Sequence, residues 1–230
     1  ISGITKRYTP TPFGIGCRVT YEMYSNDLYG PIRKAPRLLR FSMNQRVEID
    51  AANFYTQAFG TTLSTGFDSL ALFSTAHTLL RGGTYANRPT TEADLSVTSL
   101  QAATEQFEGT VNEDNLLIGA RAQTLVIPRQ LKWIAREILG SSGAPYTSDN
   151  QINSLREEGF QMSIWQYLTD ADMWFLLGPK GRYDINFFWR VKAKFDNSDD
   201  FDSGDAKFKG YMNYTLGHGD WKNAYGTQGA

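Results

Sequence analysis

Cysteine and histidine are scarce in this sequence of 230 residues, which has one cysteine, Cys17, and two histidines, His77 and His218. A single cysteine forms no disulfide within the chain, which fits a reducing compartment or indifference to redox state. Three such side chains do not make up the usual zinc-ligand sets of Cys and His. The sequence therefore predicts no disulfide framework, no metal centre and no cofactor.

An excess of charge of one sign and long apolar runs are also missing. The chain has 23 Lys and Arg against 24 Asp and Glu, a formal net charge of -1. Capture of nucleic acid by the whole surface would need a strong basic excess. No run approaches the ~20 apolar residues that span a bilayer, and no secretory signal is visible. Because the sequence opens on Ile1, we expect a preceding segment that was cleaved, disordered or removed.

Residues 1–30 are rich in Gly, Pro, Tyr and Thr and contain little core material. Val19, Tyr21 and Met23 alternate with polar residues, as in a strand or an extended arm. A short helix between Val19 and Asp27 is an alternative. So few apolar residues over this length predict an extension that packs on something outside its own domain, and the other interpretation is a floppy terminus.

One long stretch, residues 36–59, has no Gly or Pro after its first residue, and Gly60 follows directly. Proline is favoured in the first helical turn and glycine just past the last residue. One helical face carries these apolar residues: Leu39, Met43, Val47 and Phe54. A neighbouring stripe carries these: Leu38, Phe41, Ile49, Ala52 and Tyr55. A helix of this length would run ~36 Å, and we expect it to act as a strut.

Shorter periodic runs predict helices over 96–108, 128–140 and 151–158. Runs of aromatic and β-branched residues predict these strands: 124–128, 160–168, 173–178, 183–195 and 206–217. The step from strand to helix at Pro128 indicates an α+β layer with helices on one face of a sheet. We expect the strands of the second half to form a mostly antiparallel sheet. No flexible linker separates these parts, which predicts one chain-long unit.

One short stretch contains Asp68, Ser74 and His77, the residue types of a hydrolase triad. The GxSxG elbow that would present a strained serine is missing. Sequence neighbours rarely form triads, because the fold usually brings the partners together. We interpret His77 as structural and hydrogen-bonded to nearby backbone, within a strand and turn over 68–81. His218 is interpreted as a turn residue, and no catalytic residue is predicted.

The acidic run DNSDDFDSGD, residues 196–205, has the composition of a calcium loop. It fails the EF-hand pattern, because the sixth position of a loop opened at Asp196 is Phe201 rather than glycine. A solvated acidic loop is the better interpretation. Phosphate-binding loops are missing as well, since FGIG and RGG lack the Walker lysine and the full GxGxxG spacing.

A basic block lies at the start of the long helix and consists of Arg33, Lys34, Arg37 and Arg40. It could bind nucleic acid, or it could pair with an acidic loop of a neighbouring subunit. Segregated charge blocks in a near-neutral chain suit self-association better than charge-driven ligand capture. The hypothesis is that the block faces these carboxylates of an adjacent subunit: Asp199, Asp200 and Asp202.

Several segments follow one another in a recognisable order. The most specific are LFSTAH (72–77), LVIPRQL (125–131) and LTDADMWFLL (168–177). An extended arm and a long helix precede them, and GDAKFKGYMNYTLGHGDW with a YG close follows them. This order, over roughly residues 13–226, resembles that of the major capsid proteins of tailed bacteriophages, specifically the Mu-like major head subunit group.

The resemblance implies the Hong Kong 97-like phage capsid fold, which is α+β, with an extended E-loop arm, a long spine helix, a peripheral domain and an axial domain. The E-loop would lie at 8–30. The implied division of the chain is an N-terminal segment and arm at 1–30, the spine helix and part of the peripheral domain at 31–109, the axial domain at 110–182, and the return strands of the peripheral domain at 183–230.

The resemblance further implies a major capsid protein whose copies assemble as hexamers and pentamers into an icosahedral shell around the phage dsDNA genome. Such a protein is no enzyme, assembles in the bacterial cytoplasm and ends in the virion. It would contact the packaged dsDNA non-specifically, together with portal, scaffold or decoration proteins and without a membrane. Three alternatives stay open: an encapsulin-type shell protein of the same fold, an α+β hydrolase using His77, and another phage structural protein such as a tail component.

Aromatic residues make up 13% of the chain and supply anchors for contacts between subunits. Those of the arm are Tyr8, Phe13, Tyr21, Tyr24 and Tyr29. We expect them to contact neighbouring subunits, and the alternative is that they fold back on the sheet of their own chain.

Overall fold

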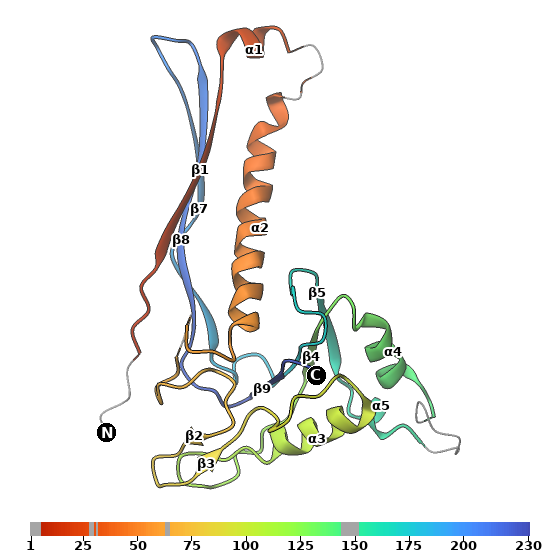
Figure 1. Ribbon diagram of the computed structural model, residues 1–230. Coiled ribbons are helices and arrows are strands. Elements are labelled where there is room, and N and C mark those ends of the chain that lie inside the picture. Colours follow the sequence, from red (N-terminus) through yellow and green to blue (C-terminus); the bar gives the residue numbers. More distant parts are fainter. Residues whose placement is uncertain (1–5, 28–29, 31, 63–64, 144–151) are drawn as a thin grey trace. The chain divides into compact units, whose positions relative to one another are not determined.

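The computed structural model describes residues 6–27, 30, 32–62, 65–143 and 152–230 (Figure 1). The chain divides into two compact units. The helix–hairpin unit comprises residues 7–51 and 186–217, and the mixed-sheet unit comprises 52–185, 218–230 and the residues before 7. The expectation of one chain-long unit is therefore wrong. Three of the boundaries fall inside a helix or a strand, where no Gly-rich or Pro-rich linker marks them.

The helix–hairpin unit has a three-stranded sheet in the order β1-β8-β7. Its elements are β1 (Thr11–Val19), α1 (Tyr21–Ser25), the 3-10 helix η1 (Ile32–Lys34), α2 (Ala35–Thr56), β7 (Ile185–Asp199) and β8 (Ala206–His218). β1 pairs antiparallel with β8, so that Phe13 lies opposite Met212 and Cys17 opposite Phe208. β7 has 15 residues and β8 has 13, so both strands of the β7–β8 hairpin are much longer than the usual strand of about 5–6 residues.

The long helix predicted over 36–59 is confirmed as α2, a helix of 22 residues. Its Met43 is buried with Met212 and Tyr214 of β8, and Phe13, Val47, Phe187 and Leu216 pack around them. Of the two predicted stripes, the one with Leu39 and Met43 thus faces the sheet. In the neighbouring stripe, Leu38 and Phe41 are each 62% exposed. The first half of the helix therefore uses only one apolar stripe within its own unit.

Tyr214 joins the helix to the sheet by a polar contact as well. Its hydroxyl donates to Asp50 Oδ2 at 2.6 Å, and Arg46 pairs with Asp50 Oδ1 at 2.9 Å. The ring stacks on Phe13 and Phe187, with centroids 4.9 and 4.8 Å apart. Burial, followed by the hydrogen bond to Asp50, raises the pKa of Tyr214. The phenol therefore stays a hydrogen-bond donor, which fixes the position of the helix along the strands.

The N-terminal segment differs from the expectation of an extension that packs outside its own domain. Residues 11–19 form the edge strand β1, whose backbone pairs with β8 of the same chain. Tyr8 stacks on Phe188 with centroids 5.7 Å apart, and Phe13 stacks on Tyr214. For Tyr8 and Phe13 the prediction of contacts to neighbouring subunits is wrong, because their rings pack on the sheet of their own chain. The alternative short helix is confirmed as α1.

The mixed-sheet unit has a four-stranded sheet in the order β5-β4-β6-β9. Its strands are β4 (Thr124–Pro128), β5 (Gln161–Trp165), β6 (Trp174–Leu177) and β9 (Ala224–Thr227), and its helices are α3 (Val97–Glu108), α4 (Lys132–Gly140) and α5 (Ser154–Glu157). A small two-stranded sheet joins β2 (His77–Thr78) and β3 (Thr84–Tyr85). β4 and β5 run parallel, because α4 and α5 lie between them in the chain and allow the crossover.

Both faces of the four-stranded sheet are buried along β4, β6 and β9, whereas Gln161 and Ser163 leave one face of the edge strand β5 exposed. On one face, Leu125 and Ile127 of β4 share a core with Leu100 of α3 and Ala135 of α4. On the other, Phe175 of β6 lies within aromatic contact of a second group: Tyr55, Phe59 and Phe73. This explains why all four residues of β6 are buried. The predicted layer of helices on one face of a sheet is confirmed.

The predicted element positions hold better than the predicted pairing. α3 starts after Ser96, whose side chain accepts from Ser99 N in a capping box, as the predicted range 96–108 requires. α4 starts only at Lys132, because Pro128 belongs to β4 and pairs with Trp165. The single, mostly antiparallel sheet expected for the second half is wrong, since its strands divide between the two units.

Gly210 of β8 provides a test of how closely α2 approaches the sheet. A Cβ atom there would overlap Met43 Sδ and lie 3.1 Å from the Phe195 ring. We expect Gly210→Val to lower the free energy of unfolding by about 1–3 kcal/mol through overpacking, measured by denaturant titration. The control is Gly14→Val on β1, where a Cβ would meet only Gly210 O at 3.9 Å. Equal stability of the two variants would contradict the close approach.

Candidate intersubunit surface

The turn of the long hairpin, residues 200–205, is held by ion pairs within the chain. Lys207 binds Asp200, and Arg18 of β1 binds Asp205. The hydrogen bond from Lys207 lowers the pKa of Asp200. Burial raises the pKa of Asp205, but hydrogen bonds from Ser203 and Arg18 outweigh it and bring the pKa below its usual value. Both carboxylates are therefore ionised and already engaged inside the unit.

One predicted contact residue has a partner within its own chain. Asp200 is half-buried and bound to Lys207, so a contact with the basic block of a neighbouring subunit would compete with this ion pair, and that contact stays a prediction. Asp199 and Asp202 are exposed and form no ion pair within the described residues. These two carboxylates remain as predicted contacts.

Three exposed aromatic residues lie in the hairpin turn and in α1. Phe201, within the turn, is 101% exposed. Tyr21 and Tyr24 of α1 are 61% and 55% exposed. A Cβ atom added to Gly204 would lie 3.5 Å from the Cβ of Tyr21, which places Tyr21 beside the turn. We call the set Tyr21, Tyr24, Asp199, Phe201 and Asp202 the acidic tip. Sequence reasoning missed Phe201, although a lone aromatic residue inside an acidic loop was the available signal.

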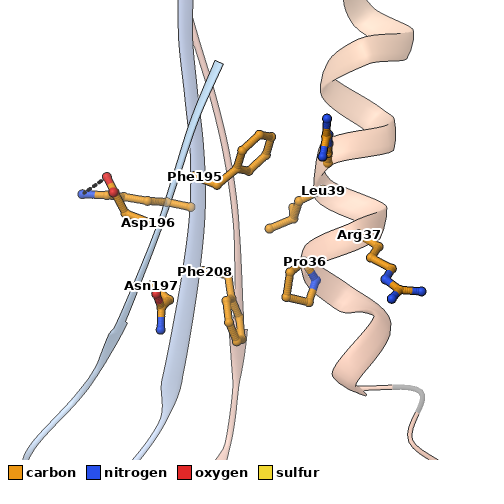
Figure 2. Close-up of a pocket in the computed structure, with 9 residues that line it drawn as sticks. Pro36, Arg37, Leu39, Phe195, Asp196, Asn197 and Phe208 are labelled. Atoms are coloured by element: carbon orange, nitrogen blue, oxygen red, sulfur yellow. Dashed lines mark ion pairs between the residues drawn. The ribbon is translucent and has the colours of Figure 1, made fainter. Parts of the chain in front are cut away.

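The opposite charge gathers on the first turns of α2. Lys34, Arg37 and Arg40 are exposed and form no ion pair within the described part of the chain. Arg37 points away from the sheet, whereas Leu39 points toward it (Figure 2). The basic stripe is therefore composed of Lys34, Arg37, Leu38, Arg40 and Phe41. Of the other predicted contacts, Tyr29 and the side chain of Arg33 lie outside the described residues.

A groove separates the start of α2 from the hairpin (Figure 2). It has a volume of about 280 Å³ and apolar walls formed by Pro36, Leu39, Phe195 and Phe208. Arg37 and Arg40 of the basic stripe also line it, together with Asn197 and the ion pair of Lys209 with Asp196 at 3.9 Å. A second groove, of about 380 Å³, continues along α2 beside Phe13, Met43 and Met212. The sheet face that packs on α2 is thus incompletely covered by the chain itself.

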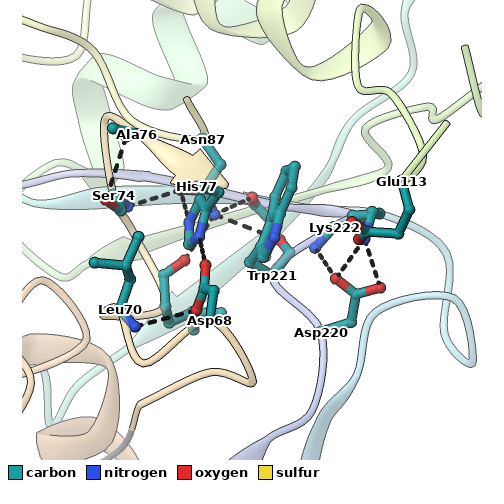
Figure 3. A network of polar contacts seen from close by, with 12 residues as sticks. Asp68, Leu70, Ser74, Ala76, His77, Asn87, Glu113, Asp220, Trp221 and Lys222 are labelled. Carbon is teal, nitrogen blue, oxygen red and sulfur yellow. Dashed lines mark hydrogen bonds and ion pairs between the residues drawn. The ribbon is translucent and has the colours of Figure 1, made fainter. Parts of the chain in front are cut away.

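The Asp68, Ser74 and His77 stretch forms a buried network in the mixed-sheet unit (Figure 3). His77 is fully buried, and its ring stacks on Trp221 at 4.4 Å. Its Nδ1 lies 2.5 Å from Asp68 Oδ2, and its Nε2 lies 3.1 Å from Asn87 Oδ1. The structural interpretation of His77 agrees with this geometry, but the expected backbone partner is wrong, because both partners are side chains.

Asn87 determines where the protons of His77 lie. Its Nδ2 donates to the carbonyls of Leu72, Trp221 and Ala224 at 2.8, 3.4 and 3.2 Å. Its Oδ1 therefore faces His77 and accepts from Ser74 N at 2.9 Å. Because an amide oxygen only accepts, His77 Nε2 carries a proton. Ser74 Oγ accepts from Ala76 N instead, so Ser74 and His77 do not form a nucleophile–base pair.

His218 is not the turn residue that the sequence predicted. It ends β8, is 1% exposed and lies edge-on to Phe54 with centroids 6.1 Å apart. Burial lowers the pKa of His218 from 6.5 to about 4, against the opposing charge of Asp68. The imidazole is thus neutral around pH 7.

Two further functional classes were tested on the described residues. No helix among them is long and apolar enough to cross a membrane. No group of three or more His, Cys, Asp or Glu side chains within the described ranges could hold a metal ion.

One family profile and several solved structures match this chain. A sequence profile described as phage capsid protein matches residues 3–226. A comparison with curated proteins finds no match. Among solved structures, the chain is similar to the capsid protein of Myoviridae phage XM1, with a TM-score of 0.59 and 9% identity over 96% of this chain and 74% of that chain.

Two other solved structures have the same fold. The capsid of cyanophage P-SCSP1u gives a TM-score of 0.59 at 11% identity, over 95% of this chain and 72% of that chain. The SrpI encapsulin from Synechococcus elongatus PCC 7942 gives 0.55 at 10% identity, over 96% and 75%. At these identities the similarity concerns the fold, which phage heads and encapsulins share.

Replacing Asn87 tests the buried network. Asn87→Ala leaves three carbonyls, the Ser74 amide and His77 Nε2 without their partner. We expect the free energy of unfolding to fall by about 2–4 kcal/mol, measured in denaturant. Ser74→Ala, which removes only the acceptor for Ala76 N, is the control and should cost less than about 1 kcal/mol. A small effect of Asn87→Ala would show that the network does not stabilise the fold.

The lowered pKa of His218 predicts a dependence of stability on pH. Between about pH 6.5 and pH 4 the unfolded chain binds a proton at His218 that the folded chain does not. Stability should therefore fall as the pH drops through this window, by up to about 3 kcal/mol. His218→Gln should flatten the profile of unfolding free energy against pH. Identical profiles for the two proteins would refute buried, neutral His218.

Proposed function

Since the chain belongs to the phage capsid protein family and is a subunit of the phage head shell, we propose that its copies assemble as hexamers and pentamers into a closed icosahedral shell around dsDNA. The match to the family over residues 3–226 carries the proposal. The Hong Kong 97-like fold supports it. Exposed apolar groups beside segregated charges add a physical reason, because such surfaces favour association with further copies.

The two units suggest how the family's domains lie on this chain. We propose that the helix–hairpin unit, with the long helix and the long strands, corresponds to the peripheral domain and that α2 is its spine helix. The mixed-sheet unit includes the predicted axial range 110–182. The assignment of residues 8–30 to an E-loop stays a prediction. Residues 11–19 of this range form β1, which pairs with β8 of the same chain.

Further partners belong to the same proposal. The shell would enclose dsDNA through non-specific contacts, assemble in the bacterial cytoplasm, and join portal, scaffold or decoration proteins. No catalytic role is proposed, since both ring nitrogens of His77 are engaged in the buried network. This argues against the hydrolase alternative. The encapsulin alternative shares the fold, and the family match favours the phage head.

The contact residues proposed between subunits are those that the structure leaves exposed. On one side they are Lys34, Arg37 and Arg40, and on the other Asp199 and Asp202, with Tyr21 and Tyr24 as aromatic anchors. Screening is strong beyond ~8–10 Å at physiological salt. The pairs therefore contribute only where the two surfaces meet directly.

Electron microscopy and sedimentation of the purified protein test the proposed function. We expect closed shells that sediment far ahead of the 25.9 kDa chain. Shells from infected or induced cells should contain nuclease-protected dsDNA. Protein cargo in place of DNA would favour the encapsulin alternative. A protein that stays monomeric at high concentration would contradict shell formation.

A further inference from the structure

Phe201 is a large apolar side chain that the chain itself leaves in solvent. It lies in the turn between β7 and β8 and is 101% exposed, whereas the carboxylates of Asp200 and Asp205 on either side are tied to basic residues of the sheet. Ion pairs thus anchor both ends of the turn, and the phenyl ring between them is exposed. Isolated exposed apolar residues are common, but this ring is accompanied by exposed Tyr21 and Tyr24.

The groove at the start of α2 has room for such a ring. It measures about 280 Å³, and Pro36, Leu39, Phe195 and Phe208 form its apolar walls, beside the polar Asn197 and the Asp196–Lys209 ion pair. An apolar cavity of ~150 Å³ is sufficient to bind benzene. Phe201 of the same chain does not fill this groove, because the ring is fully exposed. Among the described residues the groove is therefore open to a ring from another molecule.

Charge complementarity identifies a second copy as the occupant. Asp199 and Asp202 flank Phe201, and Arg37 and Arg40 border the groove. All four are exposed and form no ion pair within the described ranges. When an acidic tip enters a basic-bordered groove, these charges come within the short distance at which screening is weak. An acidic apolar tip and a basic apolar groove on one chain are complementary surfaces for self-association.

We propose that Phe201 of one copy inserts into the groove formed by Pro36, Leu39, Phe195 and Phe208 of a second copy. Asp199 and Asp202 then pair with Arg37 and Arg40 across the contact. This inference rests on the proposed shell function and names one of its contacts. Each copy donates its acidic tip and accepts one from another copy. This exchange occurs either reciprocally within a two-fold pair or from copy to copy around a ring.

Removal of the ring is the first test. Phe201→Ser should raise the concentration needed for shell formation by about tenfold or more, as for an interface anchor. The thermal stability of the dissociated subunit should stay unchanged. The control is Trp133→Ser, which removes another exposed aromatic ring, in the mixed-sheet unit. Normal assembly of Phe201→Ser beside normal wild-type shells overturns the inference and leaves the shell function intact, whereas absence of wild-type shells refutes the function itself.

A cysteine pair tests the location of the ring. In a Cys17→Ser background, subunits with Phe201→Cys are co-assembled with subunits with Pro36→Cys and then oxidised. We expect disulfide-linked dimers in this mixture and in neither variant alone. The matched control mixes Phe201→Cys with Trp133→Cys. Dimers in the control alone, or in no mixture, would place Phe201 outside the groove.

Reversal of the charges tests the flanking pairs. The double variant Asp199→Lys and Asp202→Lys should reduce the yield of shells about tenfold. Adding Arg37→Glu and Arg40→Glu in the same chain should restore most of that yield. Restoration supports the pairing, and an additive loss in the fourfold variant counts against it.

Discussion

The packing of α2 on the sheet β1-β8-β7 is the contact on which the helix–hairpin unit depends. Met43 of α2 packs on Met212 of β8, and the missing side chain of Gly210 leaves room for Met43. The Tyr214 hydroxyl donates a hydrogen bond to Asp50 of the helix. This contact uses one stripe of the helix and leaves Leu38, Phe41 and two grooves uncovered. A long helix and a long hairpin joined along one stripe form an incomplete core. The uncovered apolar surface is then available for contacts between copies, as a shell requires.

The two units divide the tasks of such a subunit. In the mixed-sheet unit both faces of β4, β6 and β9 are buried. The network of Asp68, His77 and Asn87 connects the 68–87 segment to the C-terminal strand. The residues that resemble a catalytic set are therefore part of the framework. In the helix–hairpin unit the charged and aromatic groups remain at the surface. The buried network holds distant segments of the mixed-sheet unit together, whereas the exposed tip and stripe are the surfaces that we propose for association.

Local signals in the sequence were sufficient for most elements. α2 and α3 follow from apolar spacing and from their N-terminal residues, and the strands β4 to β8 follow from aromatic and β-branched runs. The pairing of strands was not predictable, because β1 and β8 pair with each other although they lie about two hundred residues apart in the sequence. β9 was missed because AYGT is short and contains a glycine that lies against Phe73 and Phe175. The sequence showed the charge blocks that contain Arg37, Arg40, Asp199 and Asp202. It did not show that Lys207 binds Asp200 across the hairpin turn, or that Asn87 binds the carbonyls of Trp221 and Ala224, because these contacts exist only in the folded chain.

Surfaces that are exposed in one copy should be covered by other copies in the shell. Hydroxyl-radical footprinting of Phe41, Tyr24 and Phe201, read by mass spectrometry, measures this directly in dissociated subunits and in intact particles. The account predicts that all three side chains, exposed in the single chain, become several-fold less reactive in particles. Equal reactivity in the two states would contradict it.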